Sequence, residues 1–168
     1  MAPMSERTLR GKVAIAGIGE TTYYKHGQSP DAEFKLALQA VLAACRDAGI
    51  DPKEVDGFAS YGNDRSEAVR LAAALGIKEL RFSNMHWGGG GGGVAASVAN
   101  AAAAVHSGMA NCVIAFRSLA QGQFARYGRG QAVAAAAGDD AFLFPYGLMS
   151  PAQRFAIKIT RFMTEHGI

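Results

Sequence analysis

Apolar residues along the chain recur with two periods, one typical of strands and one typical of helices. Short runs of β-branched and small apolar residues predict four buried strands. These strands lie at residues 12–18, 57–61, 80–85 and 111–116. Apolar residues at helical spacing separate them, and strands that alternate with helices require crossover connections. The pattern therefore predicts an α/β fold, with a parallel sheet covered by helices on both faces.

The ends of the first two helices are marked by capping and stop residues. Ser29-Pro30-Asp31 predicts the start of the first helix, because it combines a capping hydroxyl, a proline in the first turn and an acid near the positive helix end. Gly49 is expected to end that helix. A shorter amphipathic helix is expected over 66–75, ended by Gly76.

The last part of the chain has a different character. Residues 118–149 contain no clean strand and no well-capped helix, which is typical of a functional excursion or a binding loop. Ser150 and Gln153 are then spaced as a capping box for a final helix that Gly167 ends. Its predicted apolar stripe consists of Phe155, Ile159, Phe162 and Met163.

The stretch 81–108 is the most unusual part of the sequence. The third predicted strand leads into six consecutive glycines at 88–93, and these open onto an uncharged helix that stops at Gly108. A helix that is apolar on all sides is expected to be buried, although an isolated chain would expose one of its faces. Glycine amides and the helix start can approach a carbonyl oxygen, a carboxylate or a phosphate.

Composition and charge exclude several classes of function. The chain has 168 residues, of which 49% are hydrophobic and 18% charged, so one globular core is expected. The net charge of +3 is spread out, without the basic run that nucleic-acid binding would need. The sequence has no signal-peptide core and no membrane-length apolar run, and Cys45 and Cys112 lack metal-site spacing. A cytoplasmic protein with reduced thiols and no bound metal is expected.

A dinucleotide-binding oxidoreductase is one alternative. Gly17-x-Gly19 follows the first predicted strand, but Thr22 stands where the third glycine of the fingerprint belongs. Such a site also needs an acid at the end of the second strand, and only Asp64 is available there. This alternative is weakly supported.

Four segments together carry a family resemblance. They are KVAIAGIGET, AGIDPKEVDGF, GGGGVAASVANAAAAVHSGMANCVIAF and YGLMSPAQRFAIKITRFMTEHGI. In this order and spacing, the chain resembles the N-terminal half of a thiolase-superfamily protein, in the lipid-transfer and sterol-carrier-protein thiolase-like branch. The resemblance implies a βαβαβαβ half with a parallel-rich mixed sheet over 1–117 and an inserted loop domain over 118–168. The second half is absent, so the sequence is a fragment or another polypeptide completes the fold.

The sequence departs from this family at the nucleophile. Thiolases carry a cysteine between the third strand and the buried helix, where the helix start lowers the pKa of the thiol. Here His86-Trp87-Gly88 contains neither cysteine nor serine, and Cys45 and Cys112 lie elsewhere. Cysteine-dependent chemistry is therefore excluded. Family members without the cysteine resemble steroid side-chain aldolases, which cleave β-hydroxyacyl-CoA compounds together with a small OB-fold partner.

This resemblance suggests catalytic residues. Amides of Gly88, Gly89 and Gly90 are expected to stabilise an enolate, and His86 is the nearest candidate base. A lone histidine beside a strand is also a common structural donor. Tyr146 is a second candidate for the acid–base role, and Tyr61 a weaker one.

Substrate and partner contacts are also implied. Arg117, Arg126 and Arg129 are expected to meet coenzyme A phosphates, and Met149 to line the acyl channel. Coenzyme A enters as part of the substrate, and no tightly bound cofactor is expected. A homodimer through the third strand is expected, with Trp87 near the interface. A non-catalytic subunit that binds acyl-CoA or scaffolds a partner enzyme remains the main alternative.

Overall fold

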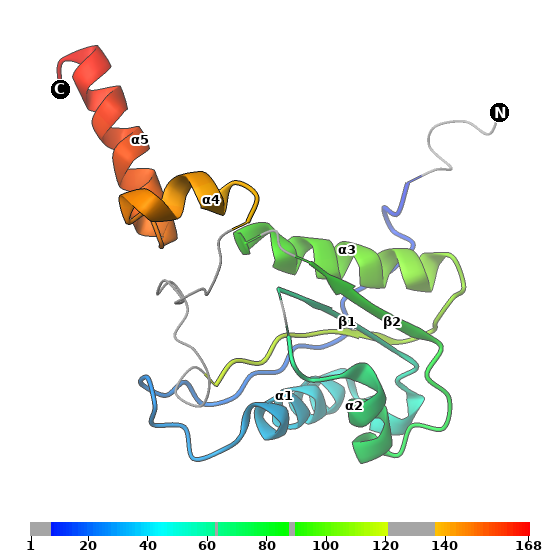
Figure 1. Ribbon diagram of the computed structural model, residues 1–168. Coiled ribbons are helices and arrows are strands. Elements are labelled where there is room, and N and C mark those ends of the chain that lie inside the picture. The colour runs from blue at the N-terminus through cyan, green and yellow to red at the C-terminus, as the bar shows by residue number, and fades with distance from the viewer. Residues whose placement is uncertain (1–7, 63, 88–89, 121–136) are drawn as a thin grey trace. The chain divides into compact units, whose positions relative to one another are not determined.

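The computed structural model describes residues 8–62, 64–87, 90–120 and 137–168. The chain divides into two compact units, Met1–Gln123 and Phe124–Ile168 (Figure 1). The boundary between the two units, at residues 123 and 124, lies outside the described residues. The division predicted at residue 117 remains a prediction.

The first unit is built on a three-stranded parallel sheet. Its strands are β1 (Gly57–Tyr61), β2 (Phe82–His86) and β3 (Val113–Ala115), in the order β2-β1-β3. Gly57 of β1 stands opposite Phe82 of β2 and Val113 of β3. These strands confirm three of the four predicted from the sequence, together with the parallel sheet and the α/β class.

Helices cover both faces of this sheet. The α1 (Glu33–Ala48) and α2 (Ala68–Leu75) helices lie on one face, and α3 (Gly93–His106) lies on the other (Figure 1). A short 3-10 turn, η2 (Pro52–Glu54), leads from α1 toward β1. The core between the sheet, α1 and α2 consists of Ala37, Val41, Cys45, Val55, Phe58, Leu71, Ala72 and Leu75.

The first predicted strand is wrong. Residues 12–18 form no strand, and the side chains of Ile15 and Ile18 are 76% and 77% exposed. A Cβ atom on Gly17 would lie 2.6 Å from the carbonyl oxygen of Ala44 in α1. The Ile18 amide donates to the carboxylate of Asp47 at 2.9 Å. The segment thus approaches a helix through its glycines instead of pairing with a strand.

The first helix also begins later than its sequence signals indicate. Ala32 precedes α1 and caps it without a side-chain hydrogen bond. The Ser29 hydroxyl instead donates to the carbonyl oxygen of Asp31 at 3.0 Å, within the preceding turn. The predicted stop is confirmed, because Gly49 adopts a left-handed conformation with φ +68°.

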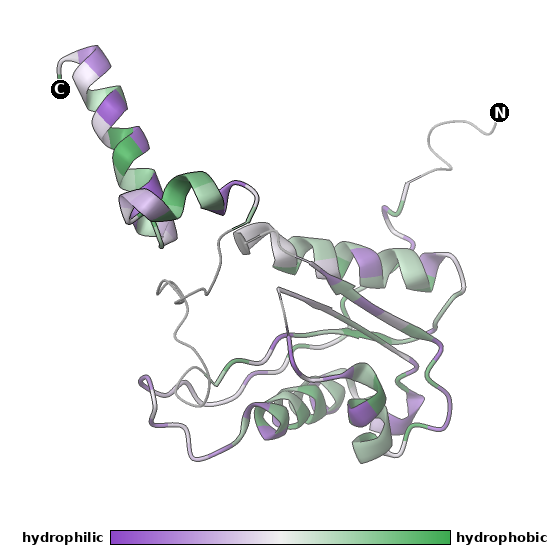
Figure 2. Cartoon of the chain, in the orientation of Figure 1, coloured by the Kyte–Doolittle hydropathy of each residue, from purple (hydrophilic) through white to green (hydrophobic). Residues whose placement is uncertain are grey.

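The α3 helix is buried on one side only. Gly93, Ser97, Ala101 and Ala104 are its buried residues, whereas Val94 and Val98 are 51% and 39% exposed. Few hydrophilic residues interrupt it (Figure 2). In the described part of the chain, the sheet covers a single face of this helix. The expected exposed apolar face is confirmed.

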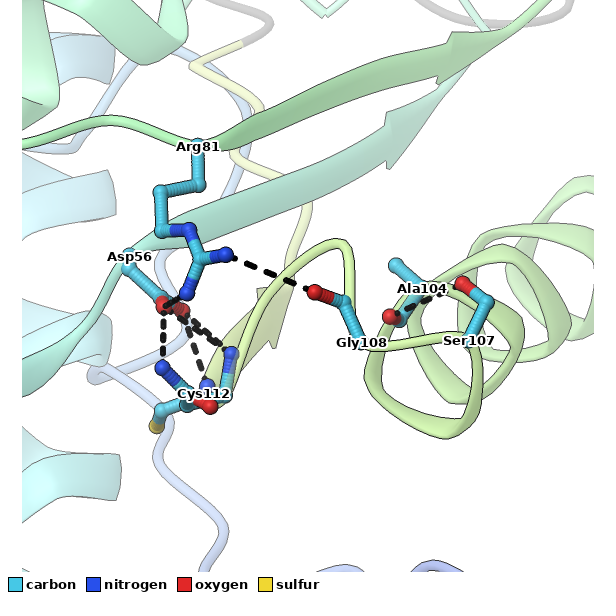
Figure 3. Close-up of polar contacts among 7 residues, drawn as sticks. Asp56, Arg81, Ala104, Ser107, Gly108 and Cys112 are labelled. Atoms are coloured by element: carbon cyan, nitrogen blue, oxygen red, sulfur yellow. Dashed lines mark hydrogen bonds and ion pairs between the residues drawn. The ribbon is translucent and has the colours of Figure 1, made fainter.

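Asp56 joins the elements at the amino ends of the strands (Figure 3). Its carboxylate accepts from the main-chain N–H groups of Asn111 and Cys112 at 2.9 and 2.8 Å, and from the Asn111 side chain at 3.1 Å. Arg81, at the entry to β2, lies 3.8 Å from the same carboxylate and also donates to the carbonyl of Gly108 at 3.4 Å. One side chain therefore ties β1, β2 and the turn after α3 together.

The second unit consists of short helical turns and one long helix. They are α4 (Asp140–Leu143), η4 (Phe144–Tyr146) and α5 (Pro151–His166). The predicted capping box is confirmed: Ser150 accepts from the Gln153 amide at 3.4 Å, and the Gln153 side chain accepts from the Ser150 amide at 2.8 Å. Arg154 pairs with Asp140 at 2.7 Å. The predicted apolar stripe of α5 is exposed within this unit.

None of the helices in the described ranges is both long and apolar enough to span a membrane.

Candidate functional site at the carboxyl edge of the sheet

The carboxyl ends of the three strands and the start of α3 converge on one edge of the sheet. Tyr61 and His86 end β1 and β2 and stand opposite each other in the register. The amide of Gly62 donates to the His86 carbonyl at 3.0 Å, which extends the pairing by one residue. In open parallel sheets this edge is where ligands bind.

The glycine run reaches α3 through a turn with open space beside it. Gly88 and Gly89 lie outside the described residues, and Gly90 begins a 3-10 turn, η3 (Gly90–Gly92). A Cβ atom on Gly91 or Gly92 would meet nothing within 4 Å. Within the described residues, the start of α3 has no side-chain cap hydrogen bond, so its first N–H donors lack a side-chain acceptor there.

His86 is the titratable side chain closest in sequence to this turn. It is half-buried at the end of β2, and its imidazole makes no hydrogen bond to another described residue. The next residue, Trp87, is 70% exposed. Among the described residues, the imidazole therefore lacks the partner that a purely structural histidine usually has.

Arg117 follows β3 and binds Tyr61 in two ways. Its Nη1 donates to the Tyr61 carbonyl oxygen at 2.6 Å, and its guanidinium carbon lies 4.6 Å from the centre of the Tyr61 ring. Gly62, with φ +60°, has no Cβ atom to collide with that Nη1. The sequence predicts a phosphate contact for Arg117 but does not indicate this contact with Tyr61.

Asp64 connects the loop after β1 to the segment after β3. Its two carboxylate oxygens accept from the amides of Ser66 at 2.7 Å and Ser118 at 2.9 Å, and the hydroxyls of those serines are 3.0 Å apart. Burial raises the pKa of Asp64, while the two amides and Arg117 act in the opposite direction. Its oxygens are thus used inside the fold, which argues against the ribose-binding role of a dinucleotide site.

The structure does not test the remaining predicted site residues. Tyr146 and Met149 belong to the second unit, where the Tyr146 side chain is 81% exposed. Arg126 and Arg129 lie outside the described residues. Their roles stay predictions.

Sequence reasoning gave no role to Glu33, which is buried at the start of α1. Its carboxylate accepts from the Ala120 amide at 3.4 Å and lies 3.6 Å from Arg65. An acidic residue in the first turn of a helix is normally a surface feature, so no sequence signal separated it from the other acids.

Comparison with known proteins identifies relatives of this chain. The steroid side-chain-cleaving aldolase of Thermomonospora curvata is 41% identical over 165 residues, which cover 95% of this chain. The 17-hydroxy-3-oxo-4-pregnene-20-carboxyl-CoA lyase of Mycobacterium tuberculosis is 38% identical over the same length and share. The chain is homologous to steroid side-chain-cleaving aldolases. No protein-family model matches it.

A solved structure supports this homology. The structure of the Ltp2-ChsH2(DUF35) aldolase superposes with a TM-score of 0.75 at 37% identity, covering 92% of this chain and 38% of that one. The chain spans 41% and 42% of the length of the two curated relatives. The homology therefore concerns a part of each relative.

The cysteines of the chain are unsuited to nucleophilic catalysis. Cys45 is buried in the core and Cys112 is half-buried, and both are free thiols. Burial above all raises the pKa of each thiol above its usual range. A reactive cysteine needs the opposite shift. The described residues also contain no cluster of three or more histidine, cysteine or acidic side chains that would hold a metal ion.

Proposed function

We propose that this chain takes part in the retro-aldol cleavage of a β-hydroxyacyl-CoA, such as a steroid side-chain CoA thioester. The observation that carries the proposal is the identity of 41% and 38%, across 95% of the chain, with proteins named for that side-chain cleavage and for a carboxyl-CoA lyase activity. The residues of the carboxyl edge are compatible with this chemistry.

The reaction needs a base and an anion site but no covalent intermediate. A base removes the proton of the β-hydroxyl group, the oxygen electrons form a ketone or aldehyde, and the Cα–Cβ bond breaks. The bonding electron pair moves into the thioester as an enolate, whose Cα then takes up a proton. Preorganised N–H donors aimed at the developing enolate oxygen lower the barrier.

We assign these roles to the residues around the glycine run. Amides of Gly88, Gly89 and Gly90 stabilise the enolate, supported by the open space beside the turn and the uncapped start of α3. His86 is the proposed base, because it ends β2 next to the glycine run and its imidazole makes no hydrogen bond to another described residue. Tyr146 is the alternative acid–base residue. Both assignments await mutagenesis.

The substrate contacts are proposed from charge and family resemblance. Arg126 and Arg129 provide cations for the coenzyme A phosphates, and Met149 lines the acyl channel. Arg117, expected from the sequence to join them, instead binds the Tyr61 carbonyl. Coenzyme A belongs to the substrate, and the proposal includes no tightly bound cofactor. The finer fold assignment, a thiolase-like half with an inserted loop domain, is part of the same proposal.

Two protein partners are proposed. The solved relative carries a DUF35 protein in its name, Ltp2-ChsH2(DUF35) aldolase, which supports a DUF35 partner for this chain. We propose that this partner is a small OB-fold protein. The β2 strand is at the edge of the three-stranded sheet, so one of its sides is unpaired within the described residues and is available to a second copy of the chain.

The test is turnover of a β-hydroxyacyl-CoA by the chain together with a DUF35 partner and any polypeptide that completes it. We expect a ketone and a shortened acyl-CoA. His86→Ala should lower kcat by about 10²–10⁴-fold, the usual contribution of a general base. His106→Ala, at the other end of α3, is the matched control and should leave kcat unchanged. Equal rates for both variants would remove His86 as the base.

The non-catalytic alternative gives a different result. Binding of acyl-CoA without cleavage, measured by titration calorimetry, would favour a binding or scaffolding subunit. Binding of NAD alone would contradict both proposals.

A further inference from the structure

Tyr61 is the residue where the elements around the glycine run meet. It ends β1 and stands opposite His86, and the next residue bonds to the His86 carbonyl. A Cβ atom on Gly93, the first residue of α3, would lie 2.9 Å from Cγ of the Tyr61 ring. Tyr61 therefore contacts both ends of the segment that carries the proposed anion site.

Arg117 holds this tyrosine by its main chain and its ring at once. One guanidinium nitrogen is used on the Tyr61 carbonyl, and the guanidinium carbon lies over the ring. Its Nε is buried and has no hydrogen-bond partner among the described residues. A cation that serves mainly to meet coenzyme A phosphates would present its donors to solvent, whereas here Nη1 binds the Tyr61 carbonyl and Nε is buried.

We propose that Arg117 is a positioning residue: by fixing Tyr61, it sets the start of α3 against His86. The inference rests on the proposed function for its catalytic consequence but has a structural readout of its own. A displacement of about 1 Å in a catalytic group costs up to about 10²-fold in rate. Arg117 thus acts on the reaction through Tyr61, without touching the substrate.

Kinetics distinguish this role from a phosphate contact. Arg117→Met should lower kcat by about 10–100-fold and change KM for the acyl-CoA by less than about threefold, since it removes alignment rather than ground-state binding. Arg117→Lys keeps the charge but lacks the planar fork, so it should reproduce most of the loss. A rise in KM with kcat unchanged, restored by lysine, would overturn the proposal and assign Arg117 to the phosphates.

Trp87 provides the readout that does not depend on activity. It is the single tryptophan of the chain and lies between His86 and the glycine run. In the 168-residue chain, Arg117→Met and Arg117→Lys should both shift the Trp87 emission maximum while the far-ultraviolet circular dichroism stays native. Tyr61→Leu should give the same shift, and combining it with Arg117→Met should add little, because both changes break one contact.

The matched control is Arg70, whose guanidinium carbon lies 4.5 Å from the ring centre of Phe34 on the α1–α2 face. Arg70→Met removes the same kind of contact away from the site and should leave the Trp87 emission unchanged. An unchanged emission in both Arg117 variants, or an equal shift in Arg70→Met, would overturn the positioning role. If the wild type does not cleave a β-hydroxyacyl-CoA but the variants shift the Trp87 emission as expected, the proposed function alone is overturned.

Discussion

Gly91 and Gly93 belong to the same glycine run but differ in their surroundings. A Cβ atom on Gly93 would overlap the Tyr61 ring, whereas one on Gly91 would meet nothing within 4 Å. In a helix, alanine is favoured over glycine by about 0.5–1 kcal/mol, and overpacking costs about 1–3 kcal/mol. The absence of a side chain is thus required for packing at Gly93 and leaves room for a ligand at Gly91.

We predict that Gly93→Ala lowers the free energy of unfolding by about 1–2 kcal/mol, because the overlap outweighs the gain in helix propensity. Gly91→Ala is the matched control and should change it by less than about 0.5 kcal/mol. Urea denaturation of the two variants measures the difference. Equal stabilities would show that Tyr61 does not press against the start of α3.

The two thiols predict a pH dependence of stability. Each has a raised pKa in the folded state, so unfolded thiols ionise at a lower pH than folded ones. Their contribution to stability is fully present below the pKa of a thiol in the unfolded chain, about 8.5. It is lost as the pH rises from there through the pKa of the thiol in the folded protein. Urea denaturation between pH 7 and pH 10 should show this decline.

A variant with Cys45→Ala and Cys112→Ala should show a smaller decline over the same pH range. In the native protein at pH 8, both thiols should also react slowly with a disulfide reagent and rapidly in urea. Rapid native labelling of Cys45 would contradict its burial in the core.

At the scale of single residues, the helix-stop glycines and the capping box were predicted correctly, whereas the start signal at Ser29 was not. Gly49, Gly76 and Gly167 all end helices in the left-handed conformation, and the capping box at Ser150 is present. The contact between Arg117 and Tyr61 joins residues 56 positions apart in sequence, so no local pattern indicates it.

At the scale of elements, Asp56 links β1 to β2 and to the turn before β3, which its position in the sequence does not indicate. It satisfies two main-chain donors of the turn before β3 and lies next to Arg81 at the entry to β2. Removing a buried acceptor costs about 1–3 kcal/mol for each donor left unpaired. This carboxylate therefore adds to the backbone hydrogen bonds that align the three strands at their amino ends.

We predict that Asp56→Ala lowers the free energy of unfolding by about 2–4 kcal/mol, because the Asn111 and Cys112 amides lose their acceptor. Arg81→Ala should cost no more than about 1 kcal/mol, since that ion pair is long and partly exposed. Thermal and urea denaturation of the two variants measure the contrast. Similar losses in both would assign the stabilisation to the ion pair.

Strands and helices were predictable where the spacing of the apolar residues agreed with the capping, stop and turn residues at the ends of each segment. The segments at β1, β2 and β3 and the helices between them follow directly from that pattern. Residues 12–18 carry a strand-like composition, but composition does not reveal whether a neighbouring strand edge is available for hydrogen bonding. Gly17 instead lies close to α1, which is a tertiary effect.

At the scale of the whole chain, each unit leaves an apolar surface uncovered within the described residues. In the first unit this surface includes Val94 and Val98 of α3, and in the second it includes Phe155 and Ile159 of α5. The uncharged sequence of α3 predicted its apolar character but not which side the sheet would cover. The spacing of apolar residues in α5 likewise predicted its apolar stripe but not the surface that packs against this stripe.

The candidate site was predictable in its location and less so in its members. The glycine run next to a strand and a helix indicated the carboxyl edge, where His86, the η3 turn and Arg117 are found. Tyr146 and Met149 were assigned by family resemblance, and they belong to the second unit. The catalytic role of Tyr146 and the substrate contact of Met149 therefore stay predictions.

The most direct test of the proposed chemistry is the mass of the acyl-CoA product formed in D₂O. The chain, its DUF35 partner and any completing polypeptide are supplied with a β-hydroxyacyl-CoA, and the products are analysed by mass spectrometry. Cleavage through an enolate predicts a shortened acyl-CoA that carries one deuterium at Cα, released with a ketone or aldehyde. Release of a free acid with an intact carbon chain, or recovery of unchanged thioester, would contradict the account.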